Sequence, residues 1–164
     1  MFLADIKKKI PNTEIVPVAL TKIKKAGLRN VILEIDLGDA TYNFEQFPVE
    51  NLCHLILKWI RWCKEHLGRE SKMFVSLRDL PDAMPTDADR VFYVISFIAK
   101  LPQDLRPIGM MFEEPRGHSL PEECGTWTRY IRRVMDEHRW TGRLLVHVHE
   151  KFGFMDATAI EVFV

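Results

Sequence analysis

The sequence has few cysteines and no excess of charge of either sign. Only Cys53, Cys63 and Cys124 are present, and this odd number without a C-x-x-C pair argues against a disulfide framework and against a four-cysteine zinc site. Lys and Arg total 23 and Asp and Glu total 23, so the 164 residues carry no formal net charge. A neutral chain offers no broad basic surface for nucleic acid or for an anionic membrane.

Segments that direct a chain into or across a membrane are also missing from the sequence. No apolar run approaches the ~20 residues that span a bilayer. The opening MFLADIKKKIP lacks the apolar core of a signal peptide and the acid-poor, Arg-rich character of a transit peptide. Together with the cysteine usage, these absences predict a cytoplasmic protein with neither a membrane nor a nucleic acid as its partner.

Three common motifs of enzymes and nucleotide-binding proteins are absent, namely G-x-G-x-x-G, the P-loop and G-x-S-x-G. Their absence argues against nucleotide binding and against serine hydrolysis. Cys124 stands near the start of an expected helix, where the pKa of a thiol can fall, but the neighbouring Glu122 and Glu123 oppose that effect. We therefore do not expect Cys124 to be a nucleophile.

Four short apolar runs rich in β-formers predict strands over residues 31–35, 73–77, 108–112 and 144–148. Each run is continuous in apolar character rather than alternating, which is typical of strands buried on both faces of a parallel sheet.

Apolar residues recur at helical spacing after each of these strands and once before the first, over 16–26. Thr86 is expected to cap the helix that follows the second strand. Ser119 and Glu122 form an S-x-x-E capping box that is expected to open the helix after the third. A last helix is expected over 156–164.

The order of these elements predicts an α/β fold in a single domain over 1–164. A helix after each strand implies a parallel sheet with right-handed crossovers. About four parallel βα units over 28–164, after an N-terminal helical segment over 1–27, correspond to a partial (β/α)8 TIM barrel, with a small open flavodoxin-like sheet as the alternative. Because a complete barrel takes ~250 residues, we expect a fragment of a larger barrel, or a homo-oligomer that covers the open barrel edges.

Polar side chains gather where these strands are expected to end, and parallel α/β proteins bind their ligands at that edge. His147 and His149 are two residues apart, so in a strand both point to the same face, ~6.6 Å apart along the chain. Imidazole suits Zn, Fe and Mn, and nearby carboxylates would complete the shell. The alternative is a pair of histidines that only form hydrogen bonds on a barrel face. The polar residues at the four strand ends are Glu34, Asp36 and Asp39; Arg78, Asp79 and Asp82; Glu113, Glu114 and Arg116; and His147, His149 and Glu150.

A carboxylate and a guanidinium group are the candidates for catalysis beside the two histidines. Adjacent strand residues point to opposite faces, so at most one of Glu113 and Glu114 faces the site, and Glu114 is the expected one, as ligand, acid or base. The alternative for these two residues is a solvated loop pair. Arg78 is expected to clamp a substrate carboxylate through two parallel hydrogen bonds. The alternative for Arg78 is a structural ion pair with Asp79 or Asp82.

The last third of the sequence, GMMFEEPRG and then LLVHVHEKFGFMDATAIEVF, resembles the later half of the hydroxymethylglutaryl-CoA lyase-like barrels, also called pyruvate carboxyltransferase domains. The resemblance implies a metal-dependent TIM barrel that makes or breaks carbon–carbon bonds next to a carboxylate or an acyl thioester. His147, His149, Glu150 and Gly153 match the family's H-x-H, acidic residue and glycine loop, which implies that the two histidines are metal ligands. Glu114 falls on the acidic position of the preceding strand, where the family has Gly-Asp. The family's D-x-R-E-like strand has no counterpart here, and its later Asn ligand would lie beyond the end of the sequence.

The resemblance implies a lyase, or an acyl or carboxyl transferase, that uses a divalent ion (Mn, Mg or Zn) held by His147 and His149. Glu114 and Arg78 are the catalytic candidates, and the substrate would be a small-molecule carboxylate or an acyl thioester. Whether a chain of this length is active stays open. The alternative from a different class is a half-barrel remnant without catalytic activity that works through association with other protein chains.

Overall fold

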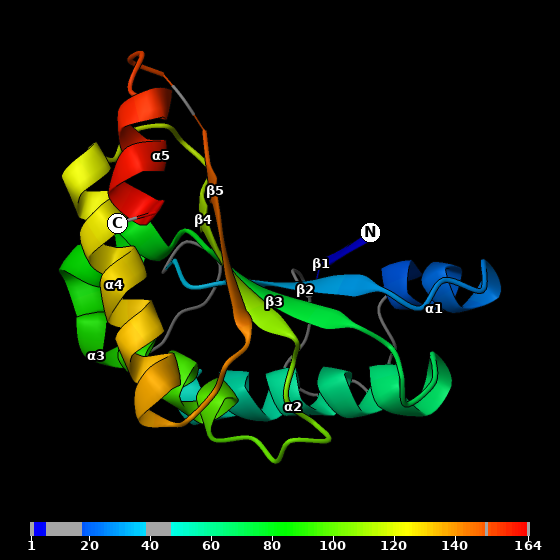
Figure 1. The fold of residues 1–164 in the computed structure, drawn as a ribbon. Coiled ribbons are helices and arrows are strands. Elements are labelled where there is room, and N and C mark those ends of the chain that lie inside the picture. The colour runs from blue at the N-terminus through cyan, green and yellow to red at the C-terminus, as the bar shows by residue number, and fades with distance from the viewer. Residues whose placement is uncertain (1, 6–17, 39–46, 150, 164) are drawn as a thin grey trace.

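A computed structural model describes residues 2–5, 18–38, 47–149 and 151–163, and it shows one parallel five-stranded sheet (Figure 1). The strands lie in the sheet in the order of the chain, β1-β2-β3-β4-β5. The α/β class and the partial barrel expected from the sequence are therefore confirmed. The elements are β1 (Phe2–Asp5), α1 (Val18–Lys25), β2 (Val31–Asp36), α2 (Val49–His66), β3 (Met73–Arg78), α3 (Leu80–Ala99), β4 (Gly109–Glu114), α4 (Pro121–Glu137), β5 (Arg143–Val148) and α5 (Met155–Phe163).

The strand β1 lies in the segment over 1–27 for which the sequence predicts only a helix. It pairs in parallel with β2, in register from Phe2↔Val31 to Asp5↔Glu34. Four residues are fewer than the usual five or six of a strand, and their local pattern carries little signal. This strand exists because it forms hydrogen bonds with β2. A pattern that considers one segment of sequence at a time does not detect such a partner.

One face of the sheet packs against helices in a single apolar core. Side chains alternate along a strand, and in β2 the residues Val31, Leu33 and Ile35 point into this core together with Val75 of β3 and Phe112 of β4. Helices α2, α3 and α4 supply the other side of the core (Figure 1). Burying each such side chain contributes about 1.5–3 kcal/mol, which fixes which face of each strand points toward the helices.

Helix α3 begins before the cap expected at Thr86 and is broken inside its length. Asp87 has non-helical backbone angles (φ −154°, ψ 75°), and its Oδ1 accepts a hydrogen bond from the backbone N–H of Arg90 at 2.9 Å. Asp87, and not Thr86, therefore caps the second half of the helix. The hydroxyl of Thr86 donates instead to carbonyl oxygens one turn back.

The start of α4 is shifted by one residue from the expected capping box of Ser119 and Glu122. The carboxylate of Glu123 accepts a hydrogen bond from the backbone N–H of Leu120 at 2.8 Å, and Pro121 takes the first helical position. The pattern S-L-P-E-E is compatible with a cap at Ser119 or at Leu120. The proline favours Leu120, because its fixed φ suits the first helical position.

The other face of the sheet carries the polar residues, and no helix covers it within the described parts of the chain. Ile32, Phe74 and Met111 form a small apolar cluster on this face. Beyond it, toward the carboxyl ends of the strands, lie buried Glu34, Ser76 and Glu113. In β5, side chains on this face are exposed and those between them are half-buried, in strict alternation.

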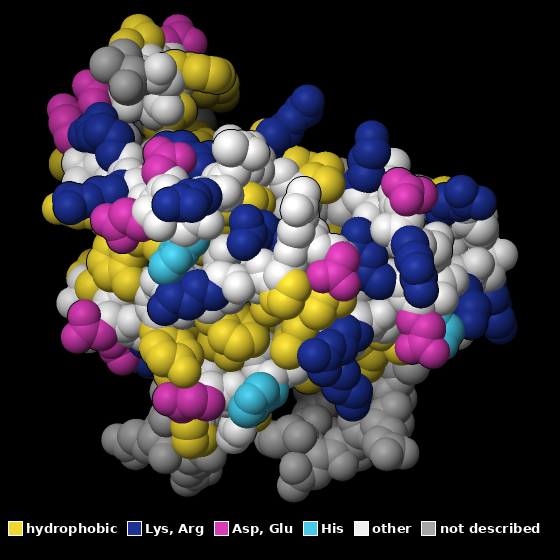
Figure 2. All heavy atoms as spheres, turned by 60° about the horizontal axis from the view of Figure 1, so that its bottom comes forward, with side chains coloured by type: hydrophobic (Ala, Val, Ile, Leu, Met, Phe, Trp, Pro, Cys, Tyr) yellow, Lys and Arg dark blue, Asp and Glu magenta, His cyan; other side chains and the backbone are white. Residues whose placement is uncertain are grey.

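The surface at the bottom of Figure 1 carries side chains of both charges, with apolar side chains between them (Figure 2). This mixture agrees with the equal totals of basic and acidic residues. Within the described residues, none of the helices combines the length and the apolar character that a membrane span requires.

Candidate metal centre

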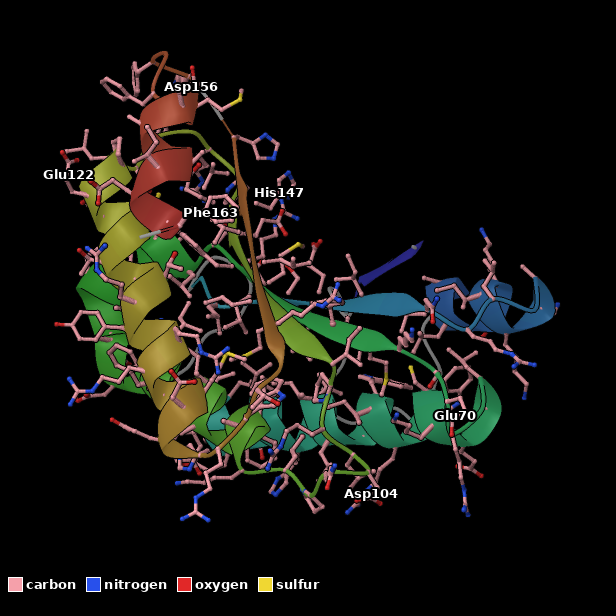
Figure 3. All side chains as sticks on the ribbon, in the orientation of Figure 1. Glu70, Asp104, Glu122, His147, Asp156 and Phe163 are labelled. Atoms are coloured by element: carbon pink, nitrogen blue, oxygen red, sulfur yellow. The ribbon has the colours of Figure 1, made fainter. Side chains whose placement is uncertain are left out.

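Three potential metal ligands meet where β4 and β5 end on the open face of the sheet. The parallel pairing sets Glu113 opposite His147, and the backbone N–H of His149 donates to the carbonyl of Glu114 at 3.0 Å, which continues the pairing beyond β5. The imidazole rings of His147 and His149 have their centroids 4.9 Å apart. Figure 3 shows His147 on the side of β5 that faces away from α4 and α5. The expectation that both histidines share one face is confirmed.

The geometry of this cluster fits one metal ion. One ligand atom each from Glu113, His147 and His149 lies within 4.8 Å of the other two. Ligands held about 2.0–2.2 Å from one ion lie roughly 3–4 Å apart, so small rotations of the two exposed imidazoles would close the site. Two imidazoles and one carboxylate suit Zn, Mn and Fe(II), and they leave positions open for water or substrate.

Glu113 is a buried carboxylate that two neighbouring side chains of β3 hold in place. Glu113 is only 8% exposed. The hydroxyl of Ser76 donates a hydrogen bond to Glu113 Oε2 at 3.0 Å, and Arg78 Nε lies 4.0 Å from Glu113 Oε1. The carboxylate therefore has a defined orientation before any ion binds.

Arg78, expected to clamp a substrate, is engaged by acidic residues of the protein itself. Its Nη1 donates a hydrogen bond to Glu34 Oε1 at 3.1 Å. Burial acts to lower the pKa of the Arg78 guanidinium, but the hydrogen bond and charge of Glu34, with the charges of Asp79 and Glu113, raise it overall. The structural ion pair considered for Arg78 thus exists, but its partners are Glu34 and Glu113.

Asp79 and Asp82, the partners considered for Arg78, pair with Arg116 in the loop after β4. Arg116 lies 2.7 Å from Asp82 and 4.0 Å from Asp79. Asp79 also has a hydrogen bond to Asp36 at the end of β2. Burial, this hydrogen bond and the charge of Asp36 raise the pKa of Asp79 to about 6, against the lowering effect of Arg116 and Arg78. The folded structure therefore favours the protonated form of Asp79 more than water does.

Glu114, the carboxylate expected beside the histidines, lies on the opposite side of β4 from Glu113. Its carboxylate accepts hydrogen bonds from the backbone N–H groups of Arg116 (3.3 Å), Gly117 and His118 (3.2 Å). Gly117 has a φ of +66°, a conformation that suits glycine and lets the chain turn around this carboxylate. The structure thus places Glu113 in the cluster and Glu114 in the folding of the β4–α4 loop.

The alternation of side chains along β4 explains why Glu113, and not Glu114, lies in the cluster. Met110 and Phe112 point into the helix-covered core, so the residues between them and Glu113 point to the open face. In the sequence, Glu113 could have been identified by its spacing from Met111, because residues two apart in a strand point to the same face. Ser76, a hydroxyl within the apolar run MFVSLR, is a second group that the sequence analysis missed.

The other residues of interest lie outside the cluster or outside the described residues. Asp39 and Glu150 belong to segments that the structure does not describe. Burial raises the pKa of the Cys124 thiol to about 11, with a further contribution from the charges of Glu114 and Glu123. This direction argues against a nucleophilic thiol at Cys124.

Comparison with known proteins gives a likeness of fold. No protein-family model matches the chain. No curated protein matches its sequence. Among solved structures, the chain is similar to hydroxymethylglutaryl-CoA lyase from Pseudomonas aeruginosa, with a TM-score of 0.60 and 14% sequence identity. The match covers 97% of this chain and 47% of that one, so the chain spans about half the length of the lyase and shares the fold of that half.

Proposed function

We propose that the chain binds a divalent metal ion through Glu113, His147 and His149. The observation that supports this proposal is the convergence of one buried carboxylate and two imidazoles at the carboxyl ends of β4 and β5. Parallel α/β barrels bind ligands at this edge. The fold neighbour is a lyase by name, which supports a reaction of the same general type.

The proposed reaction is the making or breaking of a carbon–carbon bond next to a carboxylate or an acyl thioester, on a small-molecule substrate. A bound divalent ion would act as a Lewis acid toward a carbonyl oxygen of that substrate. The residues that would hold the ion are Glu113, through a carboxylate oxygen, and His147 and His149, through one ring nitrogen each. The carboxylate of Glu114 shapes the loop above them, so the proposal assigns it to positioning and gives the ligand role to Glu113.

Metal binding is the first test of this proposal. Isothermal titration with Mn, Zn and Mg should show one ion per chain for the wild type and little binding for His147→Ala. Glu113→Gln keeps the size of the side chain and should also weaken binding, because the ligand loses its charge. His54→Ala, in an exposed position of α2, is the matched control and should bind as the wild type does. Equal, negligible uptake by all four proteins would reject the metal site.

The reaction needs a separate test, since a metal site does not require turnover. The metal-loaded wild type is incubated with an acyl thioester that has a cleavable carbon–carbon bond, and the products are followed by mass spectrometry. Cleavage that is lost in His147→Ala supports the lyase assignment. A chain that binds metal but gives no product would keep the metal site and reject the activity.

Association with another protein chain is a second candidate function, favoured by the exposure of β5. Among the described residues this strand has a neighbour on one side only, and Leu145 on its open face is 36% exposed. An open strand edge pairs readily with a further strand. Sedimentation velocity tests this function: a concentration-dependent dimer supports a homo-oligomer, and a monomer at all concentrations argues against it.

A further inference from the structure

The polar groups behind Glu113 form a continuous chain across three strands. Glu34 comes from β2, Ser76 and Arg78 come from β3, and Glu113 comes from β4. Arg78 stands between the two carboxylates, 3.1 Å from Glu34 and 4.0 Å from Glu113. Ser76 completes the chain with its 3.0 Å hydrogen bond to Glu113. This arrangement is more than a surface ion pair, because Glu34 is 3% exposed and Ser76 is 0% exposed.

The hydroxyl of Ser76 limits how the Glu113 carboxylate can turn. A serine has a single hydroxyl proton, and Ser76 donates it to Oε2 of Glu113. A buried carboxylate that turned away would leave that donor without an acceptor, which costs free energy. The second oxygen, Oε1, faces Arg78 at a distance longer than a hydrogen bond. Glu113 is thus fixed through one oxygen and keeps acceptor capacity on the other.

Arg78 links the two buried carboxylates of this chain of groups. Its Nη1 lies 3.1 Å from Glu34 Oε1, and its Nε lies 4.0 Å from Glu113 Oε1. Removing Arg78 would take away the cation that faces Glu113 Oε1, and breaking a buried pair by removing one partner is strongly destabilising. The hydrogen bond to Glu34 anchors Arg78 in this position.

We propose that Ser76 and Arg78 are positioning residues for Glu113, which hold this carboxylate in place and turned toward a metal ion. The inference rests on the proposed metal site and adds the groups that set its affinity. Groups that hold a metal ligand in this way commonly contribute 10–100-fold to metal affinity.

The test compares metal affinity among variants of the full chain. Ser76→Ala should bind Mn or Zn 10–100-fold more weakly than the wild type, and Ser76→Thr, which restores a hydroxyl, should recover most of that loss. Ser71→Ala is the matched control, because Ser71 is also buried and its hydroxyl has no hydrogen-bond partner among the described residues. The visible spectrum of bound Co(II) gives a second readout, which should change in Ser76→Ala and stay unchanged in Ser71→Ala.

Arg78→Lys provides an independent arm if Ser76→Ala does not fold. Lysine keeps the charge but lacks the planar fork that reaches two carboxylates, so affinity should again fall 10–100-fold. If the wild type binds the ion, and Ser76→Ala and Arg78→Lys show the same affinity and Co(II) spectrum as the wild type, the positioning role alone is wrong. A wild type that binds no ion would overturn the metal site and this role together.

Discussion

Asp79 provides the sharpest prediction for stability, because its ionisation is opposed by the folded structure. Its side chain is 13% exposed and lies beside the carboxylate of Asp36, and its pKa is about 6, against 3.8 for an ordinary aspartate. A folded-state pKa that is raised for an acid means that the native protein holds the proton more tightly than the unfolded chain does. The resulting stability is fully present below pH 3.8 and is lost as the pH rises through 6. Two units at roughly 1.4 kcal/mol each give a loss of about 3 kcal/mol at pH 7.5.

Asp79→Asn removes the ionisation and keeps the shape of the side chain. Asparagine also tolerates the left-handed backbone at this position, where φ is +53°. The pKa of about 6 already includes the favourable charges of Arg116 and Arg78, so the loss of these interactions in the variant is not subtracted again. We therefore expect Asp79→Asn to be about 3 kcal/mol more stable than the wild type at pH 7.5, with a difference that shrinks toward pH 4.

Urea unfolding at pH 4.0, 5.5 and 7.5 measures this effect. Asp82→Asn is the control, because it removes the closer Arg116 pair from an exposed position and should leave the pH dependence of stability in place. The charges that surround Asp79 come from Asp36, Arg78 and Arg116, and these are unchanged in both variants. If Asp79→Asn shows the same decline in stability between pH 4.0 and 7.5 as the wild type, the argument from the Asp36–Asp79 pair is wrong.

Three further predictions concern the packing and the loops. Glu114→Ala leaves three backbone N–H groups without their acceptor, so it should lower the free energy of unfolding in urea by about 3 kcal/mol. The loop after β4 should also be cleaved faster by a protease, and unchanged stability and cleavage would contradict the role of Glu114 in that loop. Gly109→Ala should cost about 1–3 kcal/mol or more by the same assay, because a Cβ there would overlap the carbonyl of Arg143 and the ring of Phe74. Burial raises the thiol pKa values to about 11–12, so a thiol reagent at pH 8 should label the unfolded chain only, and rapid labelling of the folded protein would refute this for Cys53, Cys63 or Cys124.

The sequence was sufficient to predict the sheet and its main helices, because these depend on patterns that are local. The continuous apolar runs of β2 to β5 and the helical spacing between them identify a parallel α/β fold. Features that depend on contacts with another segment of the chain were not predicted. The short β1 is defined by its pairing with β2, and the capping residues of α3 and α4 differ by one position from those expected.

The candidate site was partly predictable for the same reason. The spacing of His147 and His149 is a local property, and it predicted that the side chain in β5 and the one directly after it lie on the same face. The choice between Glu113 and Glu114 depends on which face of β4 meets the helices, and the buried Met110 and Phe112 decide it. Ser76 has no motif of its own, and its role follows only from the neighbouring strand.

The exposed position of β5 would link the proposed metal binding to assembly by mass action. His147 lies in this strand and His149 directly follows it, and within the described residues the outer edge of the strand has no neighbouring strand. A strand added at that edge would lie about 4.8 Å away, so its inward side chains would stand next to His147. A chain that placed a ligand side chain there would share the ion with the candidate cluster. Metal affinity would then rise with the concentration of the pairing chain, and the pairing would tighten by the same factor when the ion is present.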